Sequence, residues 1–215
     1  MRRMTFKLED LDVLTSENKA AVSSLLKQKS KFSAVSLFLL AAIQRVESNI
    51  AGFRSMVSSN NYPIACAILR MQIDTAMRVY GLRLMADPHD GAMKLLAGER
   101  YDRIKPKSKG DKLRDSVLLT AIDREYGWIQ RVYNRVSGMV HLSGMHIHHA
   151  IDYSDRQTQE DGSLAVSFVI GPSVPTLPAE LYDELTQAFV HASAIASTIS
   201  LAHLNAEQGF LNRDR

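Results

Sequence analysis

The stretch SKFSAVSLFLLAAIQRVESNIAGFRSMVS, residues 30–58, decides the fold class of this 215-residue chain. Its apolar side chains recur at alternating spacings of three and four residues, which places them along one face of an α-helix. The apolar positions are Phe32, Val35, Leu39, Ala42, Val46, Ile50, Phe53 and Val57. A face of this length needs other helices to cover it, so the segment predicts a core helix of a helical bundle.

Breaks in this periodicity divide the chain into further helices. The run Ser58–Asn61 interrupts the first helix, and Pro63 stands where the first turn of a following helix accepts a proline. That second helix is expected to continue to about Ala86, because Asp87 and Pro88 would end it. The same reasoning predicts helices over residues 16–29, 90–96, 111–125, 128–143 and 178–205.

Beyond Gly144 the spacing of apolar residues changes from helical to alternating. Met145, Ile147, Ile151 and Tyr153 belong to one alternating run, and residues 164–170 form another. Alternation is typical of β-strands, and the polar segment between the runs suits a turn, so we predict a β-hairpin over about 145–170.

The expected architecture is therefore mainly α, an antiparallel bundle of about four to five long helices with this one inserted hairpin. Residues 1–30 would form an N-terminal segment with a short helix, and residues 31–215 a single bundle domain. A hydrophobic content of 46% with 23% charged residues is ordinary for a globular protein. The formal charge of +3 permits a nucleic-acid partner without requiring one.

The single cysteine and the apolar runs indicate the compartment. Cys66 cannot form an intramolecular disulfide and lies in an apolar run, which favours a small core residue in a reducing cytoplasm. The longest uninterrupted apolar run, Leu37–Ile43, is far below the roughly 20 residues that span a bilayer. Acidic residues near the N-terminus stand where a signal peptide needs an apolar core. We expect a cytoplasmic protein with no membrane partner.

A polar stripe follows one side of the helix predicted over 128–143. Gln130, Asn134, Ser137 and His141 have i, i+4, i+7, i+11 spacing and return to nearly the same side of the helix. The stripe borders an apolar side that must face a core. Unpaired buried polar groups cost on the order of 1 to 3 kcal/mol each, so the stripe needs partners from another helix or from a ligand.

A partner for this stripe is available on the helix predicted over 63–86. Arg70 and Asp74 are one turn apart there among apolar neighbours. If Asp74 faces the bundle, it can accept a hydrogen bond from Ser137 or from the ring of His141. The same contact is equally consistent with a purely structural network.

Arg135 and His141 also suggest RNA cleavage. Histidine can act as acid or base, while arginine neutralises the phosphate in the transition state. On a regular helix these two side chains lie roughly 120° apart, so Ser137 aligns with His141 better than Arg135 does. A helix break at Gly138 would realign them. The alternative is that His141 hydrogen-bonds within the bundle and Arg135 is solvated.

Residues 100–114 are the most basic stretch of the chain, with seven lysines or arginines against two aspartates. Lys105, Lys107 and Lys109 could contact a phosphate backbone there, although a solvated loop is the alternative. His146 and His148 would share one strand face, but neighbouring ligands are too few, so a solvated face is favoured over a metal site. We expect no metal and no cofactor.

These motifs together resemble a broad group of uncharacterised bacterial helical proteins. That group shares an arginine with an acidic residue on one helix and a Ser, three residues, His motif on a later one. The matching residues are Arg70, Asp74, Tyr133, Asn134, Ser137 and His141, ahead of Leu142 and Ser143. The group is similar in turn to the HEPN superfamily of helical bundles, whose motif is Arg, four to six residues, His. Arg135 and His141 fit that window, and the resemblance covers about residues 31–205.

HEPN proteins often act as dimeric, metal-independent ribonucleases in toxin and phage-defence systems. The resemblance therefore implies a homodimer that acts on RNA, with His141 as acid or base and Arg135 as the phosphate contact. Asp74, Asn134 and Ser137 would position them. Two alternatives stay open. One is a non-catalytic binding module in which Arg70, Asp74, Ser137 and His141 form an internal network. The other is a small-molecule or nucleotide site between the helices.

Overall fold

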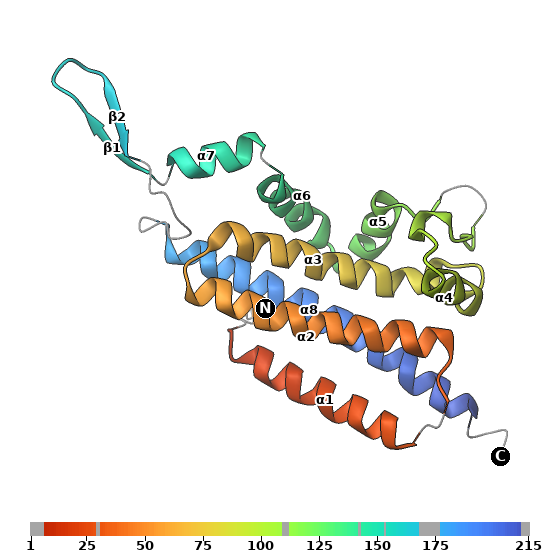
Figure 1. The fold of residues 1–215 in the computed structure, drawn as a ribbon. Helices are drawn as coiled ribbons and strands as arrows, with labels where there is room; N and C mark the ends of the chain where they lie inside the picture. The colour runs from red at the N-terminus through yellow and green to blue at the C-terminus, as the bar shows by residue number, and fades with distance from the viewer. Residues whose placement is uncertain are drawn as a thin grey trace.

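The computed structural model of the chain describes residues 7–28, 31–108, 112–141, 143–152, 154–167 and 177–211. It confirms a mainly helical fold with one small antiparallel hairpin (Figure 1). The α-helices are α1 Asp10–Gln28, α2 Ala34–Ser58, α3 Tyr62–Tyr80, α4 Pro88–Leu96, α5 Asp115–Tyr126, α6 Ile129–Val140, α7 Gly144–Asp152 and α8 Ala179–Leu211. Two short 3-10 helices, η1 Gly81–Leu84 and η2 Tyr101–Arg103, and two strands, β1 Asp155–Thr158 and β2 Leu164–Ser167, complete the described elements.

Helices α2, α3 and α8 pack against one another and form the body of the bundle. Helix α1 lies along α2 and α8, whereas α5 and α6 cover α3 on the other side (Figure 1). At the centre, the rings of Phe53 and Phe189 stack with centroids 3.9 Å apart and planes within 1°. By length and composition α2 and α8 could also cross a membrane, but a buried core helix of a soluble protein passes the same test.

A buried polar layer crosses this apolar core. Asn49 Nδ2 donates to Gln72 Oε1 at 2.7 Å, and Gln72 Nε2 donates to Ser193 Oγ at 2.9 Å. All three side chains are buried, so the chain of hydrogen bonds joins α2, α3 and α8 at one register. The surrounding sequence is apolar, and its pattern gives no sign of this layer.

Capping side chains set the helix ends that the sequence predicts approximately. Ser33 Oγ accepts from the Ser36 N–H at 2.9 Å and starts α2. Asn61 Oδ1 accepts from Ile64 at the start of α3, beside Pro63. Three helix ends differ from the predicted ones. Helix α1 begins at Asp10 and not at residue 16, and α5 begins at Asp115 and not at residue 111. The last turn predicted for the helix of α3 is the 3-10 helix η1.

The first strand of the predicted hairpin is wrong, because residues 144–152 form helix α7, which packs on α6. Ile147 and Ile151 are four residues apart, a spacing that fits one face of a helix as well as one face of a strand. The hairpin itself is shorter and projects from the end of α7 away from the bundle (Figure 1). Its register pairs Asp155 with Ser167 and Thr158 with Leu164. Residues 168–170 of the predicted second strand lie outside the described residues.

Gly127 makes the turn that orients α6 against α5. Its backbone is left-handed, with φ 69° and ψ 8°, and its N–H donates to the Asp123 carbonyl at 2.6 Å. Gly127→Ala should lower the free energy of unfolding by about 1 kcal/mol through backbone strain, since a methyl group there meets no neighbouring atom. Urea unfolding followed by circular dichroism measures this loss. Gly144→Ala, equally unobstructed but without a positive φ, is the control, and an equal loss in both would contradict the explanation.

Candidate functional site

Arg70, Asp74 and Arg78 occupy successive turns of α3 and share one face of it. Arg78 Nε lies 3.3 Å from Asp74 Oδ1, and Arg45 Nη2 of α2 lies 3.5 Å from Asp74 Oδ2. Their side chains on α3 are only 19–25% exposed, so these ion pairs are better shielded from solvent than ordinary surface pairs.

Arg70 joins α3 to α6. Its Nε donates to Ser137 Oγ at 3.1 Å, and its Nη2 donates to the hydroxyl of Tyr133. The guanidinium also lies over the Tyr133 ring, 3.7 Å from the ring centroid. The contact that the sequence predicts between the polar stripe and α3 is therefore present, and Arg70 makes it.

Asp74 has different partners from those predicted. The prediction places it against Ser137 or His141, whereas its ion pairs among the described residues are with Arg45 and Arg78. Ser137 is already occupied by Arg70, one turn earlier on the same face. Asp74 therefore supports the arginines of α3 and does not orient the histidine.

Asp115, in the first turn of α5, completes this ionic network. It pairs with Arg78 and lies 4.0 Å from Arg70 Nη2, so two arginines of α3 share its carboxylate. A carboxylate in the first turn also stabilises its own helix. Tyr101 OH donates to the Arg78 carbonyl at 2.7 Å, and burial raises the pKa of this hydroxyl, which keeps it protonated as a donor. Sequence reasoning missed Asp115, although an aspartate at a helix start was a usable signal.

The polar stripe of α6 divides into an inner and an outer part. Ser137 is half-buried against Arg70, whereas Gln130, Asn134 and His141 are exposed. The predicted helix end at residue 143 is wrong, because α6 ends at Val140 and His141 has an extended backbone with φ −93° and ψ 141°. The break therefore falls just after Val140 and not at Gly138, which is inside the helix.

Arg135 and His141 are both open to solvent. Arg135 Nη1 lies 3.3 Å from Glu184 Oε2 of α8, with side chains 57% and 66% exposed. Exposed pairs of this kind contribute only about 0–1 kcal/mol, so an anionic ligand can take the place of Glu184. Both motif residues are therefore available to a substrate, on a helix that Arg70 holds from the inner side.

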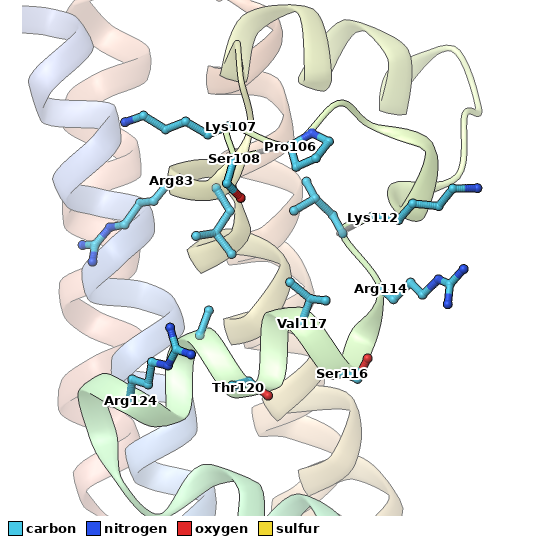
Figure 2. A pocket seen from close by; sticks show the side chains of 13 residues that line it. Arg83, Pro106, Lys107, Ser108, Lys112, Arg114, Ser116, Val117, Thr120 and Arg124 are labelled. Atoms are coloured by element: carbon cyan, nitrogen blue, oxygen red, sulfur yellow. The ribbon is translucent and has the colours of Figure 1, made fainter. Parts of the chain in front are cut away.

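Of the three lysines predicted to contact phosphate, Lys107 lines a cleft of about 970 Å³ between its own loop and α5 (Figure 2). Lys105 is exposed and is not among the lining residues, while its carbonyl accepts from Ala86 at 3.0 Å. Lys109 lies outside the described residues. We refer to this cleft as the basic cleft, after its lining cations Arg83, Lys107, Lys112, Arg114 and Arg124.

Metal and thiol chemistry receive no support from the geometry. Within the described part of the chain, no three His, Cys, Asp or Glu side chains are grouped closely enough to hold a metal ion. His146 and His148 lie on helix α7 and not on a strand. Cys66 is buried, as expected for a small core residue, and burial raises its pKa to about 12, so the thiol stays protonated and is a poor nucleophile.

No family model, no curated protein and no solved structure matches the chain, so the function of this site rests on its own geometry.

Proposed function

We propose that this protein is a HEPN-like, metal-independent ribonuclease in which α6 carries the reacting groups. The observation that supports this is the arrangement of side chains along α6. Tyr133 and Ser137 are bound to Arg70 on the inner side, while Arg135 is exposed in the middle of the helix and His141 just beyond its end. A rigidly held helix that presents an arginine and a histidine to solvent suits a large anionic substrate.

The proposed reaction uses the substrate's own 2′-hydroxyl as nucleophile. His141, as the base, removes the proton while the 2′-oxygen attacks phosphorus, and the bond to the 5′-oxygen breaks. Arg135 neutralises the charge that develops on the phosphoryl oxygens, and the exposed amide of Asn134, one residue earlier, helps to position the phosphate. The products are a 2′,3′-cyclic phosphate and a 5′-hydroxyl. A protonated histidine then donates a proton to the leaving 5′-oxygen. In a homodimer, His141 of the second protomer would be available for this step.

The direct test is cleavage of total cellular RNA by the purified protein, in EDTA, beside the His141→Ala variant. Fragments with cyclic phosphate ends that the parent forms and the variant does not are the expected result. Equal cleavage by both proteins, or cleavage by neither, would exclude the ribonuclease. As the resemblance implies, the proposed setting is a toxin or phage-defence system, with RNA as partner and no cofactor. The cytoplasm is the proposed compartment because the chain has a single cysteine.

A second candidate function is a non-catalytic binding module, and the network around Arg70 favours it. Arg70, Asp74, Arg78 and Asp115 join α2, α3 and α5, and through Ser137 also α6. Such a network fixes the register of four helices without any chemistry. His141 makes none of these described contacts, so in this case His141→Ala would leave both stability and binding unchanged.

A double-mutant cycle measures the strength of this network. Arg70→Ala should lower the free energy of unfolding by about 2 kcal/mol, because it removes charged hydrogen bonds and leaves polar partners unpaired. Ser137→Ala alone should cost about 1 kcal/mol, and the pair should couple by roughly 0.5–1 kcal/mol. Arg70→Lys should not restore the lost stability, because lysine lacks the forked guanidinium with which arginine contacts both hydroxyls. Arg131→Ala, an exposed arginine of the same helix, is the control. Additive effects of Arg70→Ala and Ser137→Ala in urea unfolding would show that the contact does not hold α6.

A further inference from the structure

The basic cleft carries an unusual concentration of one charge. Its charged lining residues within the described chain are all cations: Arg83, Lys107, Lys112, Arg114 and Arg124. Three hydroxyls, of Ser108, Ser116 and Thr120, also line it. These side chains come from η1, from the loop before α5 and from α5 itself, so the fold gathers charges that are far apart in the sequence (Figure 2).

Most of these cations form no close ion pair with another described residue. Arg83 Nη1 lies 3.3 Å from Glu125 Oε2, while the other four form no ion pair within the part of the chain that the structure describes. Lys112 interacts electrostatically with Asp102, so Lys107, Arg114 and Arg124 are the cations that add positive charge to the cleft without a described close partner. Their mutual repulsion falls when an anion enters, so the cleft attracts negatively charged ligands and raises their local concentration.

The positions of the cations indicate the shape of the ligand. Arg83, Lys107 and Arg124 lie along one side of the cleft and Lys112 and Arg114 along the other, with Val117 and Thr120 between them (Figure 2). The charged ends of Lys107, Lys112 and Arg114 point outward, away from Val117 and Thr120 (Figure 2). Side chains on opposite sides cannot all converge on one phosphate. They can each meet a different phosphate of an extended chain, as lysines and arginines do along nucleic-acid backbones.

We propose that the basic cleft binds the sugar-phosphate backbone of single-stranded RNA and holds the substrate of the ribonuclease, an inference that rests on the proposed function. No aromatic side chain lines the described cleft, so bases are not stacked and binding is expected to be independent of sequence. The 2′-hydroxyls of RNA can hydrogen-bond to Ser116 and Thr120 in the lining, whereas DNA has no 2′-hydroxyl to make these bonds.

A second cleft shares Arg114 with the basic cleft. Arg114 also lines an adjoining cleft of about 690 Å³, together with Arg78 and Asp115. Asp115 in turn pairs with Arg78 and approaches Arg70, the residue that holds α6. The ionic network of Arg78, Asp115 and Arg70 therefore lies between the basic cleft and the helix that bears the proposed reacting groups.

The test measures binding separately from cleavage. Fluorescence anisotropy of a labelled 20-nucleotide oligouridine is followed with the His141→Ala protein, which prevents turnover, at several salt concentrations. A triple variant, Lys112→Ala, Arg114→Ala and Arg124→Ala, should weaken binding at least tenfold and reduce the slope of log Kd against log salt by about 2, since each backbone phosphate contact contributes about 0.7 for single strands. The single charge reversal Lys107→Glu should weaken binding in the same direction.

The control removes the same number of charges elsewhere. The control variant combines Lys19→Ala, Lys27→Ala and Lys31→Ala. These lysines are exposed on and near α1, remote from the cleft, so this variant should leave Kd within a factor of about three. Unchanged binding in the triple variant, or an equal loss of binding in the control variant, would show that the basic cleft does not bind RNA. If binding did not depend on oligonucleotide length, and uridine monophosphate competed as effectively as the oligonucleotide, the basic cleft would be a site for small nucleotides and not for an RNA chain. If the triple variant loses binding while His141→Ala still cleaves RNA, the proposed catalytic role fails and the binding site stands.

Discussion

His141→Ala should slow RNA cleavage by about 10²–10⁴-fold, the contribution of a positioned acid or base. The melting temperature should stay close to that of the parent, because the His141 side chain is exposed beyond the end of α6 and takes no part in the Arg70 network. The measurement is a single-turnover rate on a defined oligonucleotide, with calorimetry of the same samples. A loss of activity without a loss of stability separates a reacting group from a structural one.

Two further variants sharpen this result. Arg135→Ala should cost about 10²–10³-fold in rate through lost stabilisation of charge in the transition state. Its surface pair with Glu184 contributes little, so stability should again be unchanged. His148→Ala, an exposed histidine on α7, should leave the rate intact. A slow rate in His148→Ala, or a full rate in His141→Ala, would contradict the assignment of His141.

The long helices are predictable because a core-facing stripe repeats over many turns. In α2, the positions that the periodicity assigns to the core include Val35, Val46 and Phe53, and all are buried. Helix α7 is too short for the same test, since Ile147 and Ile151 satisfy two periods equally well. Helix α7 packs on α6, and the local sequence pattern does not reveal a tertiary contact of this kind.

The candidate site is predictable only in part, because the sequence does not give the rotation of one helix against another. Polar side chains on apolar helices identify Arg70 and Ser137 as partners, and they are in contact. The partner of Asp74 comes from an exposed position of α2, where Arg45 has no distinctive sequence context. The basic cleft depends on Arg83 and Arg124, which lie far from each other in the sequence and meet only in the folded chain.

Phe53→Ala should lower the free energy of unfolding by about 3–5 kcal/mol, as large aromatic truncations in a packed core do. The stacked rings of Phe53 and Phe189 have no solvent exposure and join α2 to α8 at the centre of the bundle. Removing one ring forfeits its burial, its stacking, worth about 0.5–1.5 kcal/mol, and leaves a cavity between helices that cannot close fully. The corresponding fall in melting temperature is roughly 6–20 °C for a chain of this size.

Urea unfolding measures this loss, and two substitutions test its cause. Phe53→Leu keeps most of the volume and should cost less than half as much as alanine, because the cavity is smaller. Leu37→Ala truncates a residue of the same helix that is 44% exposed, so it should change the free energy of unfolding by no more than about 0.5 kcal/mol. If Phe53→Ala were no more damaging than Leu37→Ala, the α2–α8 contact would not form in solution. The Arg70 network would then lack its support, because α3 is held in position by packing against both of these helices.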